Sequence, residues 1–395
     1  MQQAIQSISL FLGAVEKNKR FDIIICGGGA AGLLLANALS NETAFQHLHI
    51  AIIEKEKKNT NDRTWCFWEE GEGKWDEIVS NSWGKALFKA KGYRSEFDLA
   101  PYKYKMIKGI DFYKKLYLLL KKNKNIYFLQ EEIEGISSNL DNCSVRTNAT
   151  TYSAPRVFSS IPTTKFKKQN QFPVLQQHFI GWVVKTQAPI FDPKSVIFMD
   201  FEVPQKNNTR FMYVLPFSKH EALVEYTLFS KDLLEDKEYE SAIQAYLKDK
   251  KAGEVSIIEK EKGSIPMTAY DFSQHNTANL FHIGTAGGWT KASTGFTFQK
   301  SVQKVEQLVA FMKKNKPLKD FKQKSKFNFY DLLFLDVLAK HNGEGSLLFK
   351  QMFQYNPPKR IFSFLEEKTS LWQDVAIMRS FPIRRFVSAL IKRLF

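Results

Sequence analysis

The chain has 395 residues, 44% of them hydrophobic and 34 of them phenylalanine. This is enough for a large core in two or three parts, and it favours either a Phe-rich core or an elongated apolar pocket. The formal net charge of +16 fits an anionic membrane surface or a lysine-rich solvated surface, and without a recognisable nucleic-acid-binding module we expect no nucleic-acid partner.

Cysteine spacing and hydropathy indicate the compartment. Cys26, Cys66 and Cys143 show neither a CxxC spacing nor an even-numbered framework, which predicts a reduced, cytosolic protein, and we expect no metal site. Residues 8–15 are mildly apolar but lack a basic segment before them and a clear cleavage site, so we expect no secretion signal. Since no apolar run is long enough to span a bilayer, the chain is expected to be soluble or peripheral to the inner face of the membrane.

The first elements predict a strand–helix–strand unit. Phe21–Cys26 is short and rich in isoleucine, as in a central parallel strand, and Ala30–Leu39 has helical composition. Leu48–Ile53 is a second apolar run, and Glu54 closes it. This order is typical of a Rossmann-type fold.

A glycine-rich turn joins the first strand to the helix. Its residues are Gly27, Gly28, Gly29, Ala30, Ala31 and Gly32. In a GxGxxG turn the first glycine allows the tight bend, the second lets the backbone approach a pyrophosphate, and the third lets the helix pack on the strand. Glu54 is placed to bind an adenosine ribose. The turn therefore predicts a dinucleotide site, without separating FAD from NAD.

The middle of the chain predicts an inserted antiparallel sheet. Residues 59–91 are rich in Trp, Gly and charge, and we interpret them as a loop with short elements. Helices are expected at Phe112–Leu120 and Tyr239–Lys248. Strands are expected at Ile126–Glu131, around Val145, and at Arg156–Ser160, Gly181–Thr186, Val196–Phe201, Phe211–Pro216 and Ala222–Phe229. Many strands at short spacing within an α/β pattern favour an insertion.

A second glycine-rich turn follows the apolar run Leu280–Ile283, and the chain is mainly helical after Thr294. The turn comprises Gly284, Thr285, Ala286, Gly287, Gly288 and Trp289. It resembles the late strand–turn–helix of two-domain flavoproteins, in which this turn faces the ribityl chain and the flavin. Such flavoproteins usually have Gly-Asp here, whereas this chain has Gly284-Thr285. The resemblance favours FAD, with contacts from residues 284–287.

Together these elements predict an α/β fold, a Rossmann-type FAD-binding domain with an inserted antiparallel-sheet substrate domain and a helical C-terminal region. The expected parts are the first half of the FAD-binding domain at 20–160, the substrate domain at 161–275, a second FAD-contacting part at 276–315 and the helical region at 316–395.

The last helix, Pro382–Phe395, has an apolar stripe and basic residues largely off it. The stripe is Ile383, Val387, Leu390, Ile391 and Leu394, and the basic residues are Arg384, Arg385, Lys392 and Arg393. This pattern predicts either a membrane-surface anchor or a terminal helix packed on its own domain.

Short segments spread from Phe21 to near the C-terminus carry a further signal. They are Arg63–Trp68, Tyr104–Ile107 with Asp111-Phe112, Phe198–Phe201, Phe211–Phe217, Leu223–Thr227, Gly263–Met267, Gly284–Gly288 and Ser293–Phe296. Each is weakly specific, but their order and spacing together resemble the lycopene β-cyclases of bacteria and plants.

This resemblance implies an isomerase that cyclises the ψ ends of lycopene into β-ionone rings. Members of that family need reduced FAD, commonly reduced by NAD(P)H, yet transfer no net electrons. The resemblance implies that Arg63 contacts the cofactor and that Glu225, in Leu223–Thr227, is the general acid. The family often has a second acid after this glutamate, and this chain has Tyr226 there.

The substrate chemistry fits a buried glutamate. A polyene end group has no polar handle, so ring closure must begin with protonation of an alkene carbon. A glutamate in an apolar pocket keeps its proton at neutral pH. The alternative for Glu225 is an exposed strand carboxylate paired with a lysine such as Lys219. Aromatic faces stabilise a cation, and the candidates for substrate contact are Trp68, Trp182, Tyr213 and Trp289.

Two other classes share parts of this pattern. An FAD-dependent monooxygenase or a polyprenyl reductase acting on an isoprenoid would have both glycine turns. A hydroxylase often shows an Asp-Gly pair where this chain has Ser159–Pro162, which disfavours it. A flavin-stabilised carotenoid-binding protein would bind lycopene and leave it unchanged.

Overall fold

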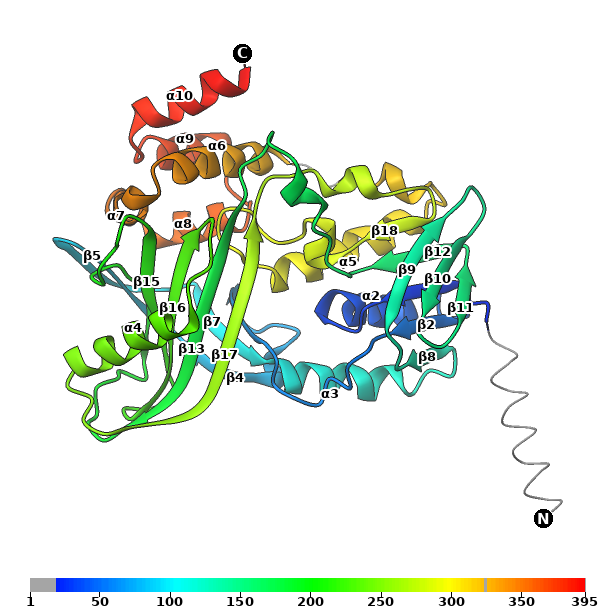
Figure 1. The fold of residues 1–395 in the computed structure, drawn as a ribbon, viewed down its shortest axis with the longest axis horizontal. Coiled ribbons are helices and arrows are strands. Elements are labelled where there is room, and N and C mark those ends of the chain that lie inside the picture. Colours follow the sequence, from blue (N-terminus) through cyan, green and yellow to red (C-terminus); the bar gives the residue numbers. More distant parts are fainter. Residues whose placement is uncertain (1–18, 323–324, 395) are drawn as a thin grey trace.

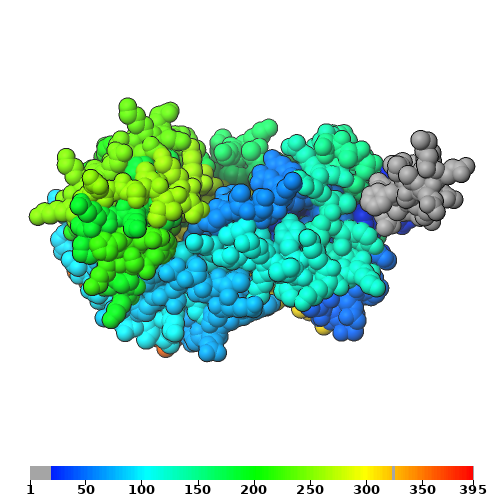
Figure 2. All heavy atoms as spheres, turned by 90° about the horizontal axis from the view of Figure 1, so that it is seen from below, coloured from blue at the N-terminus to red at the C-terminus, as the bar shows by residue number. Residues whose placement is uncertain are grey.

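A computed structural model describes residues 19–322 and 325–394, which form two large sheets and a layer of C-terminal helices (Figure 1). The apolar stretch at residues 8–15 lies outside the described residues. Seen from below, the blue-to-cyan segments lie beside the green antiparallel sheet, and the last helices are almost hidden (Figure 2).

The first sheet is parallel, with strand order β18-β12-β1-β2-β8. Its strands are β1 Ile23–Cys26, β2 Ile50–Ile53, β8 Ile126–Leu129, β12 Arg156–Ser159 and β18 Leu280–His282. One face packs on helices α2 Ala30–Asn41, α3 Gly109–Leu120 and α5 Phe298–Met312. The other face packs on a small sheet of β9 Ile133–Ser138, β10 Cys143–Thr147 and β11 Thr151–Ala154. Burial on both faces explains why β1 and β2 are almost entirely apolar.

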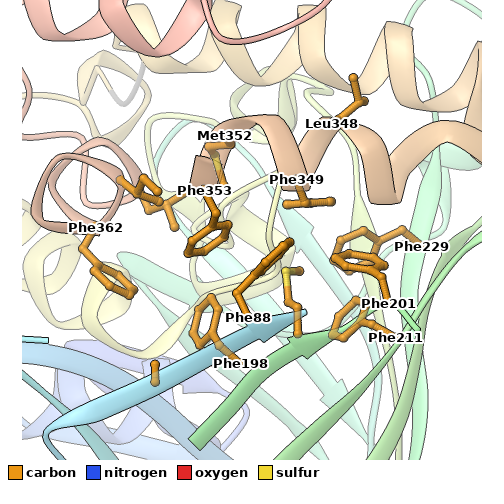
Figure 3. Packing of buried hydrophobic residues seen from close by; sticks show 14 of the residues in the cluster. Phe88, Phe198, Phe201, Phe211, Phe229, Leu348, Phe349, Met352, Phe353 and Phe362 are labelled. Carbon is orange, nitrogen blue, oxygen red and sulfur yellow. The ribbon is translucent and has the colours of Figure 1, made fainter. Parts of the chain in front are cut away.

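The second sheet is mainly antiparallel, with strand order β17-β13-β16-β15-β14-β5-β6. Its strands are β5 Lys85–Ala90, β6 Tyr93–Asp98, β13 Leu175–Thr186, β14 Ser195–Asp200, β15 Thr209–Pro216, β16 Glu221–Ser230 and β17 Val255–Met267. Helix α4 Asp236–Asp249 covers one face. The other face packs against the C-terminal helices, where phenylalanines from strands and helices interdigitate (Figure 3).

The C-terminal region consists of consecutive helices. They are α6 Lys326–Lys340, α7 Gly345–Tyr355, α8 Pro358–Leu365, α9 Leu371–Met378 and α10 Ile383–Leu394. Helix α10 packs on α6 and lies at the outer edge of this layer (Figure 1). Within the described ranges, no helix is both long and apolar enough to cross a bilayer.

Several segments differ from the sequence expectations. Residues 59–91 are mostly strand, because β3 Thr64–Glu70 and β4 Val79–Trp83 pair with β7 Tyr102–Lys108 in a separate small sheet. The next strand, β5, pairs with β14, so residues assigned to the FAD-binding part complete the second sheet. Strand β17 was not expected at all, because its charged, alternating sequence lacks the apolar run by which strands are recognised.

Candidate active site

The first glycine turn is shaped for a pyrophosphate. A Cβ on Gly27, which has φ +105°, would collide with Ser160, and a Cβ on Gly32 would collide with the carbonyl oxygen of Gly27. At Gly29, by contrast, a Cβ would meet nothing within 4 Å. No side chain caps the N-terminus of α2, so no side chain occupies the acceptor position at its first amide groups. Such a turn suits an anion at the helix N-terminus.

The acid at the end of β2 lies against this turn. The Gly28 amide donates to Oε2 of Glu54 over 2.8 Å, and the Glu56 amide donates to Oε1 over 3.1 Å. These bonds fix the carboxylate beside the glycines, where a ribose attached to the pyrophosphate would lie.

The second glycine turn lies beside the first. A Cβ on Gly284, which has φ +60°, would be 2.9 Å from Cβ of Ala31. Gly284–Gly287 form a single 3-10 turn, and Gly288 with φ +72° ends it. The helix expected after Thr294 is α5, which begins at Phe298. Thr285 and Ala286 face a large cavity.

The cavity of about 950 Å³ extends from the second glycine turn, over the antiparallel sheet, to α10. This volume lies at the upper end of about 300–1,000 Å³ for ligand sites. Its walls are mainly aromatic and aliphatic, and several are labelled in Figure 3. The phenylalanines among them include Phe179, Phe198, Phe211, Phe229, Phe296, Phe349, Phe353, Phe364 and Phe386. The Phe-rich composition therefore serves both the core and an elongated apolar pocket.

Glu225 projects into this cavity from β16. Its side chain is buried, with 7% of the residue exposed, and Thr227 Oγ1 donates to its Oε1. Burial, followed by the nearby charge of Glu261, raises the pKa of Glu225 to about 8. The alternative interpretation, an exposed carboxylate paired with Lys219, is therefore wrong. Glu225 holds its proton at neutral pH.

Neutral polar groups surround this acid. The hydroxyls of Tyr104 and Tyr213 are hydrogen-bonded over 2.7 Å. Burial raises the pKa of the Cys66 thiol to about 12 and the pKa of each tyrosine well above its usual value. All three groups are neutral at physiological pH, so they add hydrogen-bonding capacity without adding charge.

The sequence model described as "Lycopene cyclase protein" matches residues 22–391. The chain belongs to the lycopene cyclase family. A lycopene beta-cyclase of Paracoccus sp. (strain N81106 / MBIC 01143) is 29% identical over 132 residues, which are 32% of this chain. The match spans 34% of that relative's length.

The fold is that of FAD-dependent oxidoreductases. A geranylgeranyl bacteriochlorophyll reductase-like protein from Thermoplasma acidophilum aligns with a TM-score of 0.59 at 10% identity, covering 93% of this chain and 98% of its own. A flavoprotein/dehydrogenase from Cytophaga hutchinsonii aligns at 0.55 and 11% identity, covering 91% and 99%. A variant of halogenase PltM in complex with FAD aligns at 0.57 and 12%, covering 88% and 82%. At these identities the likeness concerns the fold alone.

The cavity differs from the sequence expectation in three aromatic residues. Tyr213 lines the cavity, but Trp68, Trp182 and Trp289 do not. Trp182 points to the α4 face of its sheet because side chains alternate along a strand. Trp289 is fully buried among the helices of the first sheet. Trp68 lies behind Phe296, 4.6 Å away between ring centroids.

Arg63 lines the cavity, and its charge acts on Glu261 of the antiparallel sheet. Its Nη1 donates to the carbonyl of Asp62 over 2.8 Å, and its side chain is exposed. A polar residue that was not expected, Glu261 of β17, also lines the cavity. The only sequence signal for it is the neighbouring segment Gly263–Met267, which was recognised for its resemblance and not as a strand.

Proposed function

We propose that this chain is a lycopene β-cyclase that converts ψ ends into β-ionone rings without net electron transfer. The observation that carries this proposal is a protonated carboxyl group, Glu225, in a large apolar cavity beside two dinucleotide-type glycine turns. An apolar polyene fits such a cavity, and its cyclisation must begin with protonation of an alkene carbon by an acid.

Glu225 begins the reaction by transferring its proton to the terminal alkene carbon of the end group. The new C–H bond leaves a tertiary cation, the ring C–C bond forms, and a ring C–H bond then breaks to give the β double bond. The aromatic walls exclude water, which would trap the cation, and their faces stabilise it.

FAD would be held by Gly27–Gly32, Glu54, Arg63 and the Gly284–Gly287 turn, whose geometry fits a dinucleotide. In its reduced, anionic form it would supply negative charge near the reacting end group. NAD(P)H is the proposed reductant, used to prepare the cofactor and not consumed with each turnover.

The decisive test is anaerobic. Purified protein with chemically reduced FAD and lycopene should yield β-ionone rings with no net oxidation of the flavin. Unchanged lycopene would indicate a binding protein, and a hydrogenated product with oxidised flavin would indicate a reductase. An oxygenated product in a parallel assay in air with NAD(P)H would indicate a monooxygenase. Each of these outcomes contradicts the proposal.

The substrate is proposed to enter from a membrane surface at α10. Ile383, Val387, Ile391 and Leu394 are 60%, 45%, 54% and 64% exposed, so the helix packs on α6 and still presents most of its apolar stripe outward. Ile383, Phe386, Val387 and Leu390 also line the cavity. The apolar stripe is therefore continuous with the pocket, and Arg384 and Lys392 beside it are exposed to anionic headgroups.

Replacing both Val387 and Ile391 with Glu should weaken membrane binding, because each change places a charge where apolar surface meets the bilayer. We expect at least a tenfold loss in partitioning to vesicles of phosphatidylglycerol and phosphatidylethanolamine, measured by co-sedimentation. Leu140→Glu is the matched control, since Leu140 is 92% exposed in the hairpin between β9 and β10. Equal partitioning of the double variant and the control would exclude α10 as the contact.

A further inference from the structure

A second carboxyl group, that of Glu261, lies on the same face of the sheet as Glu225, with Gly181 between them. In the sheet register, Gly181 of β13 pairs with Glu225 of β16 on one side and with Glu261 of β17 on the other. Residues paired directly across a sheet project from the same face. Both glutamates therefore point into the cavity, one from β16 and one from β17, and Gly181 of β13 lies between them.

The glycine leaves the space that the second glutamate occupies. A Cβ on Gly181 would lie 3.1 Å from Cγ of Glu261, 3.2 Å from its Oε1, and 3.1 Å from Leu223. Any larger residue would press on the Glu261 side chain. The Glu261 side chain thus lies over Gly181, on the side of the sheet that carries Glu225.

The two carboxyl groups have different partners. Glu261 Oε2 accepts a hydrogen bond of 2.9 Å from Thr64 Oγ1. Burial raises the pKa of Glu261 to about 7, and Glu259 contributes to the rise, but Thr64 and the positive charge of Arg63 oppose it. The positive charge of Arg63 favours the ionised form of Glu261, whereas no such cation among the described residues acts on Glu225, so a single proton shared by the pair resides on Glu225 and Glu261 is the carboxylate.

The residue after Glu225 cannot supply this second carboxyl group. Strand alternation points Tyr226 to the α4 face, where its hydroxyl accepts from Arg210 over 3.4 Å. A carboxylate at position 226 would be separated from the cavity by the sheet. In this chain the second acid comes instead from β17, the last strand of the sheet.

We propose, building on the proposed function, that Glu225 and Glu261 form a catalytic acid–base pair and that Glu261 accepts the proton lost by the cyclised cation. The O–H bond of Glu225 breaks as the alkene C–H bond forms, and a ring C–H bond breaks as the O–H bond of Glu261 forms. The proton then passes from Glu261 to Glu225 across Gly181. One proton enters and one leaves the substrate, no electrons are transferred, and the pair returns to its starting state.

The first test is Glu261→Gln, which keeps the side-chain shape and the Thr64 hydrogen bond but removes the base. We expect the anaerobic cyclisation rate to fall by about 10²-fold or more. Loss of the neighbouring negative charge also lowers the pKa of Glu225, so the alkaline limb of the remaining activity should move to lower pH. Lys260→Gln is the matched control on the same strand, since Lys260 pairs with Glu240 on the α4 face and does not line the cavity.

A second test needs no substrate. Both carboxyl groups have a pKa raised from 4.5, so the folded protein binds more protons than the unfolded chain, and stability is lost as pH rises through the folded values near 7 and 8. Cys66, Tyr104 and Tyr213 stay neutral over this range. Thermal unfolding from pH 5 to 9 should show a shallower loss of stability in Glu261→Gln than in the native protein or in Lys260→Gln.

The outcomes separate this pair from the broader function. Native activity with an unchanged pH profile in Glu261→Gln, or a lower rate with the alkaline limb unmoved, would overturn the pair. If the native protein makes no β-ionone rings, the proposed function fails. In that case an unfolding curve of Glu261→Gln that matches the native curve would show that the two carboxyl groups are not coupled, which overturns the pair as well.

Discussion

Glu225→Gln should lower the rate of cyclisation by about 10²–10⁴-fold, the usual contribution of a positioned general acid. The amide has the same shape as the protonated carboxyl group and still accepts from Thr227, so the fold and the flavin content should not change. The measurement is anaerobic conversion of lycopene with reduced FAD, together with the absorbance spectrum of bound flavin.

Tyr226→Phe is the matched control for this variant. It changes the next residue on the same strand, but its ring points to the α4 face, away from the cavity. We expect nearly native turnover. Retained activity in Glu225→Gln would remove that carboxyl group from the acid role, and equal losses in both variants would indicate general damage to β16.

Gly29→Ala and Gly32→Ala should fail in different ways. A methyl group on Gly29 meets no protein atom, so the protein should fold normally but lose FAD affinity at least about tenfold, or about 1.4 kcal/mol. The methyl group would occupy the space open to the pyrophosphate. On Gly32 it would collide with the Gly27 carbonyl, and overpacking of this kind lowers the free energy of unfolding by about 1–3 kcal/mol.

Flavin fluorescence titration and thermal unfolding distinguish these two effects. Gly84→Ala is the control, because a Cβ there also meets nothing within 4 Å, at an exposed turn between β4 and β5. If Gly29→Ala binds FAD as tightly as Gly84→Ala does, the first glycine turn does not hold the pyrophosphate.

Local sequence predicted the parts of the fold whose residues carry their own signal. The apolar run before Gly27 and the glycines themselves lie within one strand–turn–helix unit, so short-range pattern was enough. The same holds for β14, β15 and β16, whose ends lie within one or two residues of the expected ends.

Glu261 could not be found in this way. Residues 259–262 of β17 are alternately acidic and basic, and the first part of the strand is exposed. Its pairing with β13 is a long-range contact that local hydropathy does not encode. Without the strand there was no reason to place Glu261 opposite Gly181, and Tyr226 suggested that Glu225 had no acidic partner.

The tryptophans failed for a related reason. Trp182 lies one position from Gly181 and was expected at the substrate, yet an offset of one residue moves a side chain to the other face of a sheet. The phenylalanines that do line the cavity come from many separate strands and helices. Their convergence depends on tertiary structure, so composition indicated an aromatic pocket without indicating its members.

The alternation of β16 separates two kinds of variation within one short segment. Leu223, Glu225 and Phe229 face the cavity, whereas Val224, Tyr226 and Leu228 pack toward α4. Changes at the odd positions alter what the pocket accepts and how it reacts, and changes at the even positions alter how firmly the wall is supported. A library that varies Leu223 and Phe229 but keeps Glu225 would therefore reshape the pocket wall while the core toward α4 keeps its native residues.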